Sequence, residues 1–243
     1  DSASGEIYYQ VLAQFPDGSY AYSPTIWSRP FFQKDELCAQ WIFAPSGPTR
    51  PWRIADATGN FDITLDSTLK RWPFVALRRH ESRALKFDGD LILRPPAEAL
   101  PYGPITLEGV FRCDDLSKDQ LQYITFQHGA QATLFINRDG TVSAQRMRKH
   151  RNWPNSHVTV TSRTKLKTGR FYHAAITYDG KNLRLYLNGK LEGEAPCDGT
   201  RSNEGFFIGG MPERLRDFAR SESGKFHGTL LRISIVGRAL TEK

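Results

Sequence analysis

A basic run in the middle of the chain has the clearest potential for chemistry, because it combines several cations with an indole ring. The set comprises Arg146, Arg148, Lys149, Arg151, Trp153 and His157. Side chains two positions apart on a strand share a face, so Arg146 and Arg148 should project together, and the others should follow toward a hairpin tip. Guanidinium groups pair bidentately with carboxylates and sulfates, and an indole offers a flat apolar face to a sugar ring. The run therefore predicts a binding site for an acidic carbohydrate.

The same run has a second interpretation, a solvated basic hairpin whose Trp153 covers the hydrophobic core. Loops carry binding residues on a rigid scaffold, yet most charged side chains simply face solvent. The two interpretations differ in what a mutation does, since only a binding site loses affinity when a cation is removed.

Motifs that carry catalytic mechanisms are missing from the chain. It has no Gly-x-Ser-x-Gly elbow, no His-Glu-x-x-His run, no phosphate loop and no Gly-x-Gly-x-x-Gly run. A retaining glycosidase needs two carboxylates about 5 Å apart, whereas Glu108 is the only carboxylate well inside a clearly predicted strand. His173 shares a strand face with Phe171 and Ala175, where a packed imidazole is expected. No residue is therefore assigned a catalytic role.

Composition and charge set wide limits on function. The 243 residues are 39% hydrophobic, enough for one large β-sandwich. No apolar stretch approaches the roughly 20 residues that a membrane-spanning helix needs. The net charge of +7 favours anionic partners without choosing among them. The three cysteines lack metal-binding spacing, and Cys113 falls on the apolar face of a predicted strand, as a buried thiol would.

The C-terminal third of the chain reads as a β-meander. Phe171 to Tyr178 and Asn182 to Leu187 have the alternation of strands, and they meet at Asp179-Gly180, a pair that tolerates the positive φ angles of tight turns. Asn188-Gly189 starts the next turn, and Ile105 to Cys113 supplies another alternating strand. The chain is therefore predicted to be all-β.

The chain divides into a short N-terminal part and one large domain. Residues 1–35 read as a β-hairpin segment, which is either extra strands of the sandwich or the end of a preceding β-module. Residues 36–243 carry the remaining strands. One short helix is expected from Pro212 to Ala219, because proline suits the first turn of a helix.

Several short landmarks punctuate the larger domain. They are Ala84-Leu-Lys-Phe-Asp-Gly89, Phe171-Tyr-His-Ala-Ala-Ile-Thr-Tyr178, Leu185-Tyr-Leu-Asn-Gly189, and the closing Phe226-His-Gly228 to Arg238-Ala-Leu240. In this order they resemble the laminin-G-like, concanavalin A-like jelly-roll family, over roughly residues 36 to 243. The resemblance implies a concanavalin A-like jelly-roll sandwich of two antiparallel sheets in an extracellular, cell-surface or periplasmic protein.

The resemblance also implies a structural Ca²⁺ ion held by loop oxygens, for which Asp56, Asp88 and Asp90 are the candidate ligands. Relatives commonly close with an acidic pair where this chain has Leu231 and Arg232. That departure removes two carboxylates, so any calcium site that used them is lost.

These observations predict a non-catalytic carbohydrate-binding or interaction module of a secreted or surface polysaccharide-handling protein. Its basic balance favours acidic polysaccharides as partners, with no nucleic acid partner and no membrane span. The alternative is a jelly-roll polysaccharide lyase or glycoside hydrolase acting on an anionic polysaccharide. The sequence leaves the oligomeric state, the glycan and its linkage open.

Overall fold

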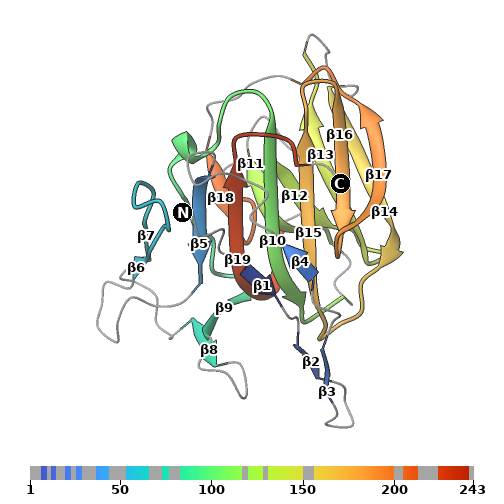
Figure 1. Cartoon of the computed structure of the whole chain (residues 1–243). Helices are drawn as coiled ribbons and strands as arrows, with labels where there is room; N and C mark the ends of the chain where they lie inside the picture. Colours follow the sequence, from blue (N-terminus) through green and yellow to red (C-terminus); the bar gives the residue numbers. More distant parts are fainter. Residues whose placement is uncertain are drawn as a thin grey trace, which may run out of the picture.

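Strands with one apolar face are stable when two sheets pack those faces together. Two antiparallel sheets do so in the computed structural model of the chain (Figure 1). The structure describes residues 37–43, 53–65, 73–76, 83–116, 120–127, 131–149, 156–199, 205–212 and 224–240, together with the backbone of four short strands nearer the N-terminus. The predicted all-β jelly-roll fold is confirmed.

The larger sheet has eight strands. Its order is β17 (Lys190–Pro196), β16 (Asn182–Leu187), β15 (Phe171–Tyr178), β10 (Ile105–Cys113), β19 (His227–Val236), β9 (Arg83–Asp88) and β8 (Phe74–Ala76), with β5 (Leu37–Ile42) also paired to β19. The second sheet has the order β14 (His157–Lys165), β13 (Thr141–Met147), β12 (Thr133–Ile136), β11 (Gln122–Gln127) and β18 (Phe206–Ile208). Hairpin neighbours alternate with pairs that are distant in sequence, such as β10 with β15 and β19, and β11 with β18.

Smaller elements lie outside these sheets. They are the pairs β1 (Ile7–Tyr9) with β4 (Ile26–Ser28), β2 (Leu12–Gln14) with β3 (Tyr20–Tyr22) and β6 (Arg53–Ile54) with β7 (Ile63–Thr64), and the 3-10 turn η2 (Ala97–Ala99). The β2–β3 pair forms the hairpin expected near the N-terminus. The boundary expected after residue 35 stays a prediction, and the expected helix from Pro212 to Ala219 lies outside the described residues beyond its first position. No helix in the described ranges is long and apolar enough to cross a membrane.

Strand β10 shows how alternation builds the core. Ile105, Leu107, Phe111 and Cys113 point to the interior and are at most 1% exposed. The Phe111 ring meets the Phe226 ring edge-on at 6.3 Å. Burial raises the pKa of the Cys113 thiol to about 11. The sequence-based expectation of a buried, inert thiol at this position is therefore supported by its environment.

The β15–β16 hairpin forms as its turn residues predict. Gly180 has a φ of 97°, which an L side chain adopts only with strain. Asp179 Oδ1 accepts hydrogen bonds from the backbone N–H groups of Lys181 and Asn182 at 2.8 and 2.7 Å. Partial burial of Asp179 opposes its ionisation, but these bonds and the Arg184 guanidinium at 2.7 Å lower its pKa to about 2. The carboxylate is thus committed to holding the turn.

A single carboxylate joins the edges of the two sheets. Glu192 of β17 accepts hydrogen bonds from the backbone N–H groups of Arg163 and Thr164 in β14 at 2.8 and 3.0 Å, and from the Thr164 hydroxyl at 2.8 Å. An edge strand otherwise leaves such N–H groups open to another chain. This seam holds β14 beside β17 at the edge of the sandwich.

Candidate functional site

Arg146 lies inside the sandwich rather than on a hairpin surface. It continues the inward-facing series of Val142 and Ala144 on β13, and it is 2% exposed. Its Nη1 donates a hydrogen bond to the carbonyl oxygen of Gln131 at 2.6 Å, and its Cζ lies 3.7 Å from the centre of the Tyr178 ring. Burial lowers the pKa of Arg146. The sequence predicted Arg146 as a ligand-binding residue that projects with Arg148 from a strand, but in the structure its guanidinium forms a buried cation–π pair.

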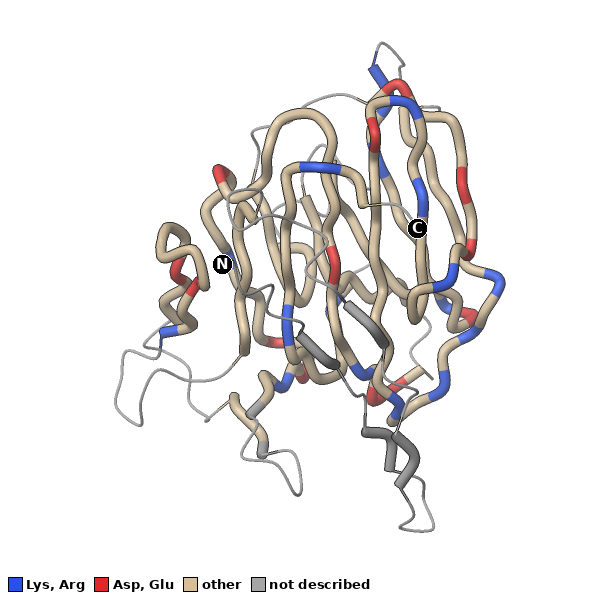
Figure 2. Tube along the Cα trace, viewed as in Figure 1, with Lys and Arg blue, Asp and Glu red and all other residues tan. Residues whose placement is uncertain are grey.

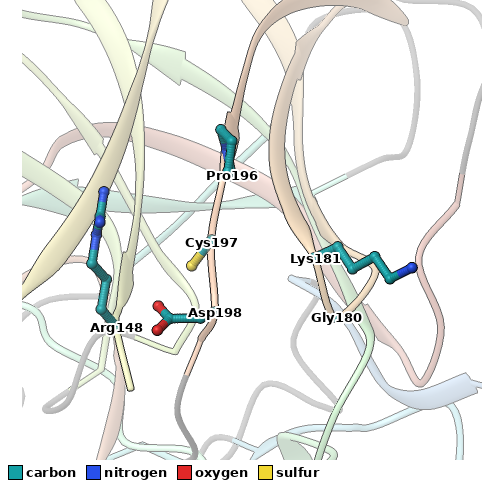
Figure 3. A pocket seen from close by; sticks show the side chains of 6 residues that line it. All are labelled: Arg148, Gly180, Lys181, Pro196, Cys197 and Asp198. Atoms are coloured by element: carbon teal, nitrogen blue, oxygen red, sulfur yellow. The ribbon is translucent and has the colours of Figure 1, made fainter. Parts of the chain in front are cut away.

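Arg148 follows on the same inward-facing side, beyond the last residue of β13, where the sandwich opens to solvent. It lines a pocket of about 380 Å³ with Gly180, Lys181, Pro196, Cys197 and Asp198. We call this the Arg148 pocket. Figure 3 shows the Asp198 carboxylate and the Cys197 sulfur directed toward the strand that carries Arg148, while the Lys181 side chain extends away from them.

The floor of the Arg148 pocket is tightly packed. A Cβ atom on Gly199 would collide with Arg146 Nε and would come within 3.0 Å of the Tyr178 ring, so this position requires glycine. Cys197 is 3% exposed. Burial raises the pKa of its thiol, although a hydrogen bond from Gly199 and the charge of Arg146 both act to lower it. The chain leaving β17 therefore closes over the buried guanidinium.

The remaining residues of the basic run have different fates. Lys149 is exposed, next to Arg148. His157 begins β14, where burial lowers its pKa and its Nδ1 lies 2.9 Å from Ser156 Oγ. Arg151 and Trp153 lie outside the described residues, so their predicted contacts with a sugar stay predictions. The structure thus brings only part of the predicted set to one place.

Asp56 is a structural carboxylate of the loop after β6. It is 4% exposed, and it accepts hydrogen bonds from the backbone N–H groups of Gln40 at 2.7 Å and of Asn60 and Phe61 at 3.2 Å each, and from the Thr58 hydroxyl. Its oxygens therefore satisfy the chain's own donors. A calcium ion would have to displace these bonds.

Asp88 ends β9, and Asp90 lies in the bend that follows it. Asp88 pairs with the first residue of β19. Asp56 bridges to a residue of β5, and the β19 partner of that residue lies about 20 Å further along β19, at ~3.3 Å per residue. Asp90 faces Lys225 at 3.5 Å. Within the described ranges, no group of three or more His, Cys, Asp or Glu is placed to hold a metal ion. The three aspartates therefore do not fit one calcium site.

Glu108, His173 and Arg232 form a hydrogen-bonded cluster on the outer face of the larger sheet. His173 Nε2 lies 3.0 Å from Glu108 Oε2, and Arg232 Nη2 lies 3.1 Å from Glu108 Oε1. Burial opposes ionisation of Glu108, but His173 and Arg232 lower its pKa to about 2. The packed imidazole expected at His173 is found, with a carboxylate as its partner. A carboxylate this strongly held as an anion is a poor proton donor.

The sequence matches a family model described as the concanavalin A-like lectin/glucanases superfamily over residues 87–243, more than half of its length. The chain belongs to the concanavalin A-like lectin/glucanases superfamily. A search of curated proteins found no match.

Solved structures similar to this superfamily member share its fold at low sequence identity. Domain 4 of an extracellular arabinanase from Geobacillus stearothermophilus, in complex with arabinotriose, is 16% identical, with a TM-score of 0.53; the match covers 85% of this chain and 94% of that one. Trypanosoma rangeli sialidase in complex with sialic acid is 12% identical, with a TM-score of 0.57, over 95% of this chain. The binding domain of botulinum neurotoxin serotype D is 12% identical, with a TM-score of 0.59, over 85% of this chain.

The superfamily member spans only part of some of these proteins. It covers 34% of the sialidase and 49% of the toxin binding domain.

Sequence reasoning named only Arg148 as a site residue and missed the other five residues of the pocket, namely Gly180, Lys181, Pro196, Cys197 and Asp198. The Asp179-Gly180 turn was recognisable, but nothing local indicated that it lies beside the end of β13. Pockets assembled from separate strands in this way depend on how the sheets pack.

Proposed function

We propose that this concanavalin A-like chain is a non-catalytic module that binds an acidic glycan at the Arg148 pocket. The observation that carries the proposal is a guanidinium lining an open pocket, backed by a second, buried guanidinium at Arg146. Lys181 also lines the pocket, with its side chain extending away from Cys197 and Asp198 (Figure 3). Charge-assisted bonds from guanidinium to carboxylate or sulfate are strong and geometrically specific.

One comparison supports a carbohydrate ligand. Domain 4 of the arabinanase matches over nearly its whole length and is recorded with a bound arabinotriose, so the same architecture serves sugar binding in that protein. That arabinanase is extracellular. By this likeness we infer that the present chain is also a part of a secreted or surface protein that handles polysaccharide.

A binding role also agrees with the state of the strand carboxylate. Glu108 is engaged by His173 and Arg232 on the outer face of the larger sheet, whereas the Arg148 pocket opens at the end of the sandwich. In the pocket, Asp198 is the one carboxylate among the described lining residues. A lyase or a hydrolase would need further acid–base groups there.

The test is to measure binding of the chain to an array of acidic and neutral glycans, beside an assay for unsaturated products and new reducing ends. We expect acidic glycans to bind, Arg148→Ala to weaken that binding at least 10-fold, and no product to accumulate. Lys167→Ala is the matched control, since it removes one exposed cation beyond the far end of β14. Equal binding by Arg148→Ala and the parent chain would refute the site, and product formation would refute the non-catalytic role.

A further inference from the structure

The Arg148 pocket has two chemically different sides. Arg148 stands at the end of β13, and Asp198 faces it from the segment that follows β17 (Figure 3). Among the described residues no ion pair joins the two side chains. A cation and an anion that line one pocket without neutralising each other leave room for a ligand that satisfies both.

The Arg148 side retains hydrogen-bonding capacity. Within the described part of the chain, Arg148 Nε is buried and makes no hydrogen bond. A buried N–H group without a partner is unfavourable by roughly 1–3 kcal/mol, and Arg146 Nε shares this state, so what points to a ligand is the position of Arg148 in the pocket wall. A planar carboxylate matches the fork of a guanidinium.

The Asp198 side selects against a second negative charge. Asp198 is exposed. An ionised carboxylate can accept hydrogen bonds from the hydroxyl or amide N–H groups of a ligand. A sugar that carries one carboxylate and several hydroxyl groups meets both sides of the pocket. A polysulfated sugar would bring one of its sulfates against Asp198, and that repulsion opposes binding.

The size of the pocket limits how much of a glycan it takes. Its volume of about 380 Å³ is near the lower end of the range for small-molecule sites, which begins at roughly 300 Å³. Gly199, which follows the lining residue Asp198, packs tightly against Arg146 and Tyr178. One sugar ring therefore fits better than a run of several.

We propose that the Arg148 pocket recognises a single carboxylated sugar residue, with the sugar carboxylate on Arg148 and its hydroxyl or amide donors on Asp198. This inference rests on the proposed function and narrows its ligand from acidic glycans in general to monocarboxylated sugars. Arg146 acts as a positioning residue, because it holds Tyr178 and the chain around Gly199 in place beneath the pocket without reaching the ligand.

The test is a titration of the whole chain with methyl glycosides of glucuronic acid and of N-acetylneuraminic acid. Methyl glucoside is the neutral control, and heparin is the polysulfated comparison. We expect one of the carboxylated glycosides to bind in preference to methyl glucoside. Arg148→Ala should weaken that binding at least 10-fold, a value that follows from the roughly 1.5–3 kcal/mol of a charged hydrogen bond. Arg148→Lys should restore part of it, since lysine keeps the charge but loses the fork.

The Asp198→Asn variant separates the inference from the broader function. We expect it to weaken binding of the carboxylated glycoside and to strengthen binding of heparin, since the repulsive charge is gone. Lys and Arg also gather along β14 and the following turn (Figure 2), so Lys167→Ala tests whether that surface binds the ligand instead.

Each outcome decides one of the two proposals. If heparin binds through Arg148 but neither glycoside binds, or if Asp198→Asn changes neither ligand, the single-sugar inference is refuted and acidic-glycan binding stands. If no acidic ligand binds at all, both are refuted. If Lys167→Ala loses binding and Arg148→Ala keeps it, the ligand lies on the β14 surface and the pocket assignment is refuted.

Discussion

Glu108→Gln should destabilise the protein at neutral pH and much less in acid. The pKa of Glu108 lies at about 2, against an ordinary value of 4.5, because the His173 and Arg232 contacts outweigh the effect of burial. At ~1.36 kcal/mol for each unit of pKa, the shift corresponds to about 3 kcal/mol. The Glu108 side chain is only 15% exposed, so solvent screens these contacts weakly.

The sign follows from linkage. Because the folded pKa is depressed, the stabilisation is fully present above pH ~4.5 and declines as the pH falls from 4.5 toward 2. Urea unfolding of the parent chain and of Glu108→Gln at pH 7 and at pH 3 measures both free energies. We expect a difference of about 3 kcal/mol at pH 7 and a clearly smaller one at pH 3, with unchanged m-values.

The matched control is Glu194→Gln. Glu194 pairs with Arg184 at 2.9 Å, but its side chain is 38% exposed. Exposed ion pairs stabilise by about 0–1 kcal/mol, so this variant should change little. Equal stability of Glu108→Gln and the parent chain at pH 7, or the same loss at both pH values, would contradict the assignment of an ionised Glu108 held by His173 and Arg232.

Three further predictions concern packing and the sheet edges. Glu192→Ala should lower the unfolding free energy by about 2–5 kcal/mol, because the backbone N–H groups of Arg163 and Thr164 lose their acceptor. Urea titration measures this, and a smaller loss of unfolding free energy than that of Glu194→Ala would contradict it. Gly199→Ala should lower the melting temperature by several degrees and weaken glycan binding, since its methyl group meets Arg146 and Tyr178. Calorimetry and binding titration check this, and a variant with the melting temperature and affinity of the parent chain would overturn it. Iodoacetamide at pH 8 should modify Cys38 before Cys113, because Cys38 is partly exposed whereas Cys113 is buried with a pKa raised to about 11; mass spectrometry that finds Cys113 labelled first would refute it.

Much of the fold was predictable because its determinants are local. The Asp179-Gly180 turn and the alternation of Phe171–Tyr178 and Asn182–Leu187 specify a hairpin, and the structure pairs Tyr178 with Leu183 as expected. The same period-two alternation placed Cys113 in the core and put His173 on one strand face with Phe171 and Ala175. Resemblance to a known family then extended these local statements to a whole sandwich.

The candidate site was predictable only in part. Alternation correctly put Arg146 and Arg148 on one face of a strand. Because charged side chains usually point to water, that face was expected to be exposed. The structure turns it inward, where the Tyr178 ring contacts the Arg146 guanidinium and the missing side chain of Gly199 makes room for it. Such compensation comes from strands that are remote in sequence.

By itself, then, the sequence determined the strands, their turns and the family, since these depend on neighbours along the chain and on a period of two. Tertiary structure alone decided which cations meet which carboxylates. Glu108 pairs with His173 and Arg232 because β10 lies between β15 and β19, and Asp198 faces Arg148 because the exit of β17 closes over the end of β13. Contacts between side chains from separate strands depend on sheet order and register, and neither leaves a mark within one segment of sequence.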